Sequence, residues 1–201
     1  MNRNFRPEFR FDEAPSRKHG EGEEIRFGFG KSSLGLVLVA ASEKGIVSVS
    51  IGADQTSLME TLQQEFPSAH LVRERGTLDD FIPRVIDFVE NPVGTFDQPL
   101  DLRGTDFQKS VWRAVQQIPA GQTSSYSEIA GKIGAPKAIR AVASSCSKSK
   151  FAIIVPCHRV LHKDGTPCGG GGENNWQVVL IAREVRVQQA NGVAKKKRKS
   201  G

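Results

Sequence analysis

Residues 25–52 hold three short segments rich in β-branched and aromatic side chains, and these segments constrain the fold more than any other part of the chain. They read IRFGFG, LGLVLVAA and GIVSVSIG, and glycines or the sequence SEKG separate them. Val, Ile and Phe favour strands, and connections this short join neighbouring strands that run in opposite directions. The sequence therefore predicts an antiparallel β-meander.

Two amphipathic helices are expected after the meander. The segment DQTSLMETLQQEF has apolar residues at helical spacing, and Asp54 is its candidate N-cap. A second helix is expected over residues 78–90, with Pro83 in its early turns, where a missing N–H is tolerated. Together with the meander, these helices predict a small α/β domain over residues 23–100.

The second half of the chain is expected to be mainly helical. Two helices begin with capping boxes, in which side chains three residues apart satisfy each other's backbone amides: Thr105 with Gln108, and Ser125 with Glu128. A third helix is expected over APKAIRAVASSC, with Pro136 in its first turn. Short helices joined this closely predict a helix-turn-helix, and the chain as a whole is assigned to the α+β class.

Charge is distributed unevenly along the chain. Residues 1–100 carry 11 basic and 16 acidic side chains, whereas residues 101–201 carry 17 basic and 6 acidic ones, five of the cations lying in KKKRK at 195–199. This asymmetry indicates a polyanionic partner for the basic half, although a solvated charged surface explains it equally well. The KKKRK segment has three interpretations: a nuclear localisation signal, an electrostatic DNA-binding arm or an expression tag.

Composition excludes several classes of protein. No apolar run approaches the roughly 18 residues that cross a membrane, and the N-terminal segment lacks the apolar centre of a secretory signal. Cys146, Cys157 and Cys168 form neither a disulfide framework nor the paired ligands of a zinc site, so we expect a reducing, cytoplasmic compartment and no metal. The expected organisation is a disordered segment at 1–22, an α/β domain at 23–100, a helical domain at 101–190 and a basic tail at 191–201.

Cys157 and His158 are the residues most able to carry chemistry. A thiol reacts as its thiolate, so a nucleophilic cysteine needs a neighbouring base, which a carboxylate commonly orients. Neighbours on an extended segment point to opposite sides, and a turn beginning at Pro156 would be needed to bring the two side chains together. The pair alone leaves a second interpretation open, in which Cys157 is a buried core residue at the end of the apolar FAIIV segment.

A longer pattern favours the nucleophile. The string GTDFQKSVWRAVQQIPAGQTSSYSEIAGKIGAPKAIRAVASSC, followed by IIVPCHRV, resembles the catalytic domain of the Ada-type alkylguanine-DNA alkyltransferases, the methylated-DNA–protein-cysteine methyltransferases. The resemblance covers residues 104–165 strongly and the preceding α/β segment weakly. It implies a ribonuclease H-like N-terminal domain followed by a winged-helix-like catalytic domain.

The resemblance also implies an activity, the single-turnover transfer of an alkyl group from O6-alkylguanine or O4-methylthymine in DNA to a protein thiol, with no cofactor or diffusible methyl donor. Cys157 matches the acceptor thiol, His158 the base that draws its proton through water, and Glu184 the carboxylate that orients the histidine. Tyr126 matches the tyrosine that helps rotate the damaged nucleotide out of the duplex and contacts the flipped base.

The implied partner is double-stranded DNA containing an alkylated guanine, bound by a monomer and with no role for a membrane. Arg140 matches the arginine finger that enters the base stack in place of the flipped nucleotide. Phosphate contacts are expected from Lys137 and Lys109, and the small side chains of Ala141 and Ser144 allow close approach to the groove.

The base pocket implied by the resemblance is lined by Pro156, Val160, Gly170 and Gly171, with the Val160 backbone accepting from the guanine amino group. The chain departs from the family here, because Gly169–Gly172 replace an aromatic segment that walls the pocket. Ser149 also stands where the family has an asparagine. Four successive glycines supply no wall and lose much backbone freedom on ordering.

Three functions are therefore compared. The first is a transferase, with a widened or an impaired pocket. The second is a lesion-binding protein that flips alkylguanine with weak or no transfer. The third, an ordinary helix-turn-helix transcription factor, does not explain IIVPCHRV.

Overall fold

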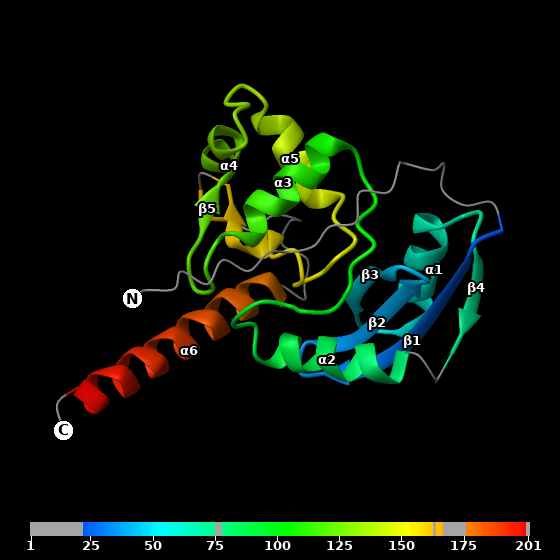
Figure 1. Cartoon of the computed structure of the whole chain (residues 1–201), viewed down its shortest axis with the longest axis horizontal. Helices are drawn as coiled ribbons and strands as arrows, with labels where there is room; N and C mark the ends of the chain where they lie inside the picture. The colour runs from blue at the N-terminus through cyan, green and yellow to red at the C-terminus, as the bar shows by residue number, and fades with distance from the viewer. Residues whose placement is uncertain (1–21, 75–77, 163, 167–175, 200–201) are drawn as a thin grey trace, which may run out of the picture.

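The computed structural model describes residues 22–74, 78–162, 164–166 and 176–199, except the side chains of Asp79 and of residues 190–199. The α+β class predicted from the sequence is confirmed by a sheet in the first half and a group of helices in the second (Figure 1). No helix among the described residues is both long and apolar enough to cross a bilayer. The segment expected to be disordered, residues 1–22, lies outside the described residues except for Gly22.

The predicted meander forms the body of the sheet. Strands β1 (Glu24–Ser32), β2 (Gly35–Ser42) and β3 (Gly45–Gly52) pair antiparallel in sequence order. A fourth strand that the sequence did not predict, β4 (His70–Arg73), pairs parallel with β1 and completes the order β3–β2–β1–β4. The chain reaches that edge by crossing over one face of the sheet through a helix, as a parallel connection requires.

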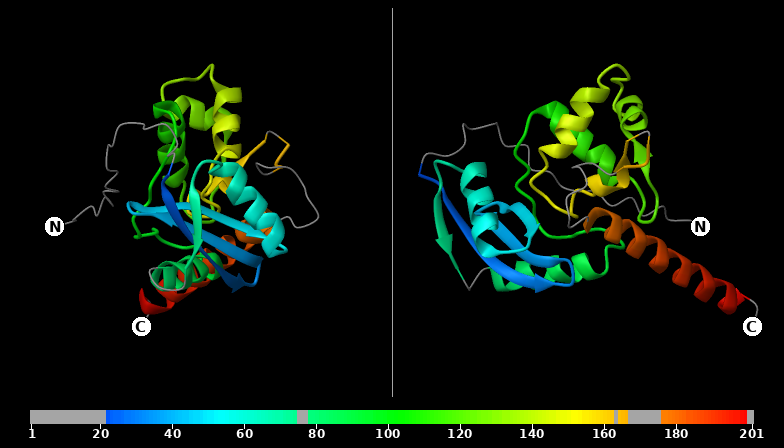
Figure 2. Two further views of the ribbon diagram at one scale, coloured as in Figure 1. Left: turned by 90° about the vertical axis from the view of Figure 1, so that its right-hand side faces the viewer. Right: turned by 180° about the vertical axis from the view of Figure 1, so that it is seen from behind.

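Two helices cover the sheet, one on each face (Figure 2). Helix α1 (Gln55–Glu65) begins at the predicted N-cap, where the Asp54 carboxylate accepts from the Ser57 N–H at 2.9 Å. Helix α2 (Leu78–Glu90) has the predicted bounds and includes Pro83. The side chains of β2 alternate between the two faces, so that one set packs on α1 and the other on α2 and the helical half.

The second half contains four helices among the described residues, together with a short 3₁₀ turn and two two-residue strands. Its elements, in order, are α3 (Asp106–Gln116), β5 (Ser124–Ser125), α4 (Tyr126–Lys132), α5 (Ile139–Ser147), η1 (Cys157–Arg159), β6 (Val160–Leu161) and α6 (Trp176–Lys199). Both predicted capping boxes are confirmed, at the starts of α3 and α4. Helix α6 extends away from the body and includes the basic 195–199 segment (Figure 1).

The start predicted for the third helix of this half is wrong. Pro136 and Lys137 lie in a turn, and α5 begins at Ile139 with Ala138 as its N-cap. The preceding helix ends with Gly134 in the left-handed region, at a φ of 72°, and the Ala135 N–H donates back to Ala130 O. This closed helix end requires extra residues before the next helix can start, which displaces α5 three residues along the chain.

The helical half is hydrogen-bonded directly to the sheet. Val49 of β3 donates its N–H to Lys150 O at 2.7 Å and accepts from the Ala152 N–H at 2.9 Å. One continuous apolar cluster joins β2 and α2 to buried side chains of the second half, among them Trp112 and Phe151. The segment leading to Cys157 is therefore anchored on the sheet, while the domain boundary near residue 100 stays a prediction.

We predict that Gly45→Ala destabilises the fold by about 1–3 kcal/mol, because a β-carbon there meets both an unfavourable backbone conformation and a steric clash. Gly45 has a φ of 134°, and a β-carbon would lie 2.4 Å from Pro99 O. Urea unfolding measures the loss. The matched control is Gly131→Ala in α4, where a β-carbon meets nothing within 4 Å and should stabilise the helix; equal losses in both variants would contradict the strain.

Candidate active site

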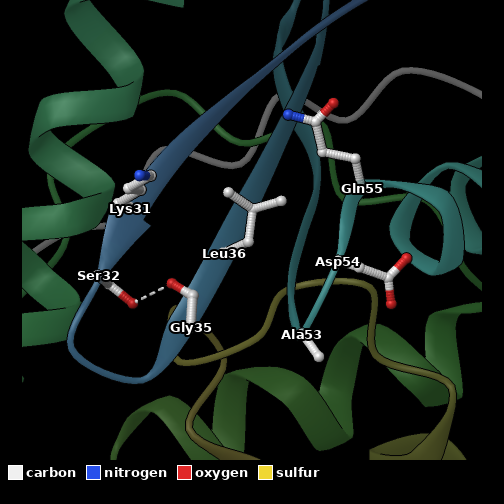
Figure 3. Close-up of a pocket in the computed structure, with 7 residues that line it drawn as sticks. All are labelled: Lys31, Ser32, Gly35, Leu36, Ala53, Asp54 and Gln55. Atoms are coloured by element: carbon white, nitrogen blue, oxygen red, sulfur yellow. Dashed lines mark hydrogen bonds between the residues drawn. The ribbon is translucent and has the colours of Figure 1, made fainter.

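A hollow of about 420 Å³ at one end of the sheet contains none of the expected chemistry (Figure 3). It is lined by residues of β1, β2 and the start of α1: Lys31, Ser32, Gly35, Leu36, Ala53, Asp54 and Gln55. Its polar groups already serve local structure, because Asp54 caps α1 and the Ser32 hydroxyl donates to Gly35 O. The lining includes neither a thiol nor an imidazole, so the candidate site lies elsewhere.

The turn that carries Cys157 starts at the sheet edge. After Phe151 the chain passes through Ile153, whose φ of 69° lies in the left-handed region that a β-branched residue strongly disfavours. Ile153 is buried, so packing holds the strained conformation. The Cys157 N–H donates to Val155 O at 2.7 Å, and Cys157 opens the 3₁₀ turn with its side chain half-buried.

A fully buried carboxylate, that of Glu184, lies at the centre of the site. It accepts from His158 Nε2 at 2.8 Å, from the Gly121 N–H at 2.9 Å and from the Arg159 guanidinium at 2.9–3.1 Å. Burial alone raises the pKa of Glu184, but the hydrogen bonds from His158 and Arg159 outweigh it and hold that pKa below its ordinary value. Glu184 is therefore an anion at neutral pH.

The hydrogen bond to Glu184 fixes the tautomer of His158. An ionised carboxylate only accepts, so Nε2 carries the proton and Nδ1 has the lone pair. The Nδ1 atom is buried and has no hydrogen-bond partner within the described part of the chain. Burial lowers the pKa of His158, against the opposing effect of Glu184, so the ring is neutral and Nδ1 is able to accept a proton.

Tyr126 reaches the same region through the two short strands. β5 and β6 pair parallel, with Ser124 opposite Val160 and Ser125 opposite Leu161. Tyr126 follows Ser125 as the first residue of α4, and its buried ring meets the edge of the His162 ring with centroids 4.9 Å apart. The structure thus brings the Tyr126 helix start against the strand that follows Cys157.

The predicted DNA-contacting side chains share one exposed surface of the helix-turn-helix. Arg140, Ala141 and Ser144 are exposed on α5, and Lys137 is exposed in the turn before it. The opposite side of α5 is anchored, because Val142 and Cys146 are buried and the Trp112 N–H donates to Ser145 O at 2.9 Å. Lys109, the other predicted phosphate contact, lies on α3 and is half-buried, so it is less exposed than the residues on and before α5.

The predicted pocket residues are only partly described. Pro156 and Val160 are buried beside Cys157, and Pro156 also lines a hollow of about 30 Å³ with Arg159. Gly170, Gly171 and the rest of the Gly169–Gly172 segment lie outside the described residues, as does Cys168. Trp176 is half-buried at the start of α6, and its ring centroid lies 6.5 Å from that of His158.

Arg159 is a residue of the site that sequence reasoning missed. Its side chain is buried, contacts both oxygens of Glu184 and donates to Ile118 O at 2.6 Å. One signal was available: an arginine directly after an apolar segment and a Cys-His pair is costly to bury unless it has an anionic partner.

Comparisons with known proteins place the chain in a family. Residues 106–186 match the model described as "6-O-methylguanine DNA methyltransferase, DNA binding domain". The inducible methylated-DNA–protein-cysteine methyltransferase of Bacillus subtilis is 36% identical over 149 residues, which cover 74% of this chain and 83% of that protein. The chain belongs to the methylated-DNA–protein-cysteine methyltransferase family.

Two further comparisons show how much of a methyltransferase of this family the chain spans. The bifunctional transcriptional activator/DNA repair enzyme Ada of Escherichia coli is 40% identical over 173 residues, 86% of this chain but 49% of that protein. The chain thus spans about half the length of the first curated relatives. The crystal structure of Mycobacterium tuberculosis OGT in complex with DNA is 34% identical, covering 81% of this chain and 93% of that chain, with a TM-score of 0.64.

We predict that the buried imidazole makes the folded chain less stable as the pH falls from about 7 toward the lowered pKa of folded His158. In the unfolded chain the ring has a pKa of about 6.5 and is protonated in this pH range, whereas the folded ring stays neutral because burial lowers its pKa. The free energy of unfolding therefore falls by up to about 1.4 kcal/mol for each pH unit. Urea unfolding between pH 7.5 and 5 measures this slope. His158→Gln should flatten the slope and His70→Gln, an exposed control, should not; an unchanged slope in His158→Gln would contradict the prediction.

Proposed function

We propose that this protein repairs DNA by transferring the alkyl group of O6-alkylguanine directly to Cys157. The observation that carries the proposal is the hydrogen-bonded series Arg159–Glu184–His158, which ends at the buried Nδ1 acceptor of His158, the residue that follows the half-buried Cys157. The Bacillus subtilis relative, named for methyl transfer from DNA to a protein cysteine, supports the same chemistry.

The proposed step balances in atoms and charge. The Cys157 thiol passes its proton, through a water molecule, to Nδ1 of neutral His158. The thiolate attacks the alkyl carbon from the side opposite O6, the S–C bond forms and the C–O6 bond breaks. The electron pair of that bond passes to the guanine, which takes up one proton from solvent and regains its unmodified form, while protonated His158 returns one proton to solvent. No redox change occurs, and the thioether has no easy route back to a thiol, so each molecule acts once.

DNA enters the proposal through the exposed α5 surface. The alkylated carbon of a paired guanine lies inside the duplex, so the nucleotide must be extruded at a cost of a few kcal/mol. Arg140 is proposed to occupy the vacated place in the stack, and Lys137 to contact a phosphate. Tyr126, buried beside the strand that follows the thiol, is proposed to contact the flipped base.

Several finer assignments also belong to this proposal. The sheet half is proposed to be ribonuclease H-like and the helical half winged-helix-like. The substrate is proposed to be duplex DNA carrying O6-alkylguanine, with O4-methylthymine as a second substrate, recognised by a monomer without a cofactor. Pro156 and Val160 are proposed to line the base pocket, completed by Gly170 and Gly171.

Transfer is favoured over lesion binding alone. A protein that only senses alkylguanine needs neither a nucleophile nor a base, yet here the residue that follows Cys157 is an imidazole oriented by a buried carboxylate. The alternative of lesion binding rests on the glycines at 169–172. Within the described part of the chain, the hydrogen bonds of Glu184 come from Gly121, His158 and Arg159, none of which belongs to that segment.

We predict that Cys157→Ala abolishes transfer of a labelled methyl group from duplex DNA to the protein, while binding to O6-methylguanine DNA changes by less than about threefold. The reason is that the thiol is the acceptor but contributes little contact surface. Gel transfer and fluorescence anisotropy measure the two properties. Cys146→Ala, which changes a buried thiol on α5, is the matched control and should still accept the label; persistent transfer in Cys157→Ala would refute the assignment.

We also predict that Arg140→Ala slows reaction with methylated duplex by about tenfold or more but leaves reaction with free O6-benzylguanine close to the wild-type rate. Only the duplex requires a substitute for the extruded base. Lys148→Ala, an exposed cation at the other end of α5, is the control and should affect the duplex less. Equal losses on both substrates would count against a stacking role for Arg140.

A further inference from the structure

Arg159 contacts the same carboxylate that binds His158. Nε is 3.1 Å from both oxygens of Glu184, and Nη2 is 2.9 Å from Oε1, the same oxygen that accepts from His158 Nε2. The guanidinium and the imidazole therefore share one carboxylate oxygen. No solvent screens them, since the side chains of Glu184 and His158 are fully buried and that of Arg159 is 6% exposed.

Backbone carbonyls hold Arg159 in place independently of Glu184. Nη1 donates to Ile118 O at 2.6 Å, and Nη2 lies 3.4 Å from Pro92 O. These two carbonyls lie in segments that precede the nucleophile in the chain, one after α2 and one after α3. The cation is thus fixed by the scaffold, and it presents a rigid donor fork to the carboxylate.

Among the residues that the structure describes, the charged groups that contact the His158–Glu184 pair come from two elements. Glu184 approaches from α6, Arg159 from the 3₁₀ turn, and the titratable neighbour on that turn is the Cys157 thiol. Arg159 and Glu184 together are neutral, so the buried carboxylate already has a counter-ion. Without Arg159, the buried carboxylate would lack a counter-ion. Protonation of the adjacent imidazole would then supply the missing positive charge.

We propose that Arg159 is a positioning residue that keeps His158 neutral, with Nε2–H on Glu184 and the Nδ1 lone pair available for the Cys157 proton. The inference rests on the proposed function, because neutrality of the ring matters only if the ring accepts that proton. Charge is the property that Arg159 supplies: a protonated His158 would have N–H groups on both ring nitrogens and could not act as a base.

The test compares Arg159→Gln with Arg159→Lys. The His158 pKa is measured by NMR titration of the imidazole, and the transfer rate from a methylated duplex is measured from pH 5 to 9. In Arg159→Gln we expect the His158 pKa to rise by at least one unit, the acid limb of the rate profile to move upward equally, and the rate to recover partly at high pH. Arg159→Lys keeps the charge, so its acid limb should stay near that of the wild type while the rate falls.

A second pair of variants tests the same coupling from the carboxylate side. Glu184→Gln leaves the Arg159 cation beside the ring and should lower the His158 pKa further. The double variant Arg159→Gln/Glu184→Gln removes both charges and should return that pKa below the value in Arg159→Gln. If Arg159→Gln alone does not fold, the double variant is compared with Glu184→Gln: a higher His158 pKa in the double variant supports a role for the Arg159 charge, and an equal pKa contradicts it.

A purely structural role gives a different result. In that case Arg159→Gln would slow transfer by one factor at every pH and leave the His158 pKa unchanged, which would overturn the proposal, as would a rise of that pKa in Glu184→Gln. Failure of the wild-type protein to transfer the methyl group would refute the proposed function instead. The NMR titrations would still decide whether Arg159 controls the charge of His158.

Discussion

The buried carboxylate of Glu184 is the constraint on which the rest of the site depends. An isolated buried charge is unfavourable by several kcal/mol or more, so its donors must all be supplied by the fold. Among the described residues they come from two places far from Glu184 in the sequence: the Gly121 N–H, and the consecutive side chains of His158 and Arg159. Any fold that satisfies Glu184 in this way also fixes the orientation and proton of the imidazole beside Cys157.

The sheet contributes to this site although it carries none of its reactive groups. Val49 of β3 pairs with the segment that leads to the Cys157 turn, and the strained Ile153 lies between that pairing and the turn. Arg183, next to Glu184 on α6, donates to Val89 O and to the Ser33 hydroxyl. The first half of the chain therefore holds in place both the turn that carries Cys157 and the helix that carries Glu184.

Features set by local interactions were predictable from the sequence, and those set by distant partners were not. The Asp54 cap and both capping boxes involve side chains and amides within three residues, and all three are confirmed. Strands β4, β5 and β6 are too short for a pattern and exist because a distant partner pairs with them. Arg159 was missed for the same reason: its counter-ion lies 25 residues away and its carbonyl partners still further, so its place beside an apolar segment suggested a need for an anionic partner but did not identify that partner.

The central claim is that the Cys157 thiol takes the alkyl group from damaged DNA, with the buried Arg159–Glu184–His158 series supplying the base. Peptide mapping by mass spectrometry after exposure to an O6-methylguanine duplex tests it most directly. The account predicts one methyl group per chain, found on the peptide containing Cys157, with Cys146 and Cys168 unmodified. A folded protein that binds the duplex and emerges with Cys157 unmodified, or with the methyl group on another cysteine, would contradict it.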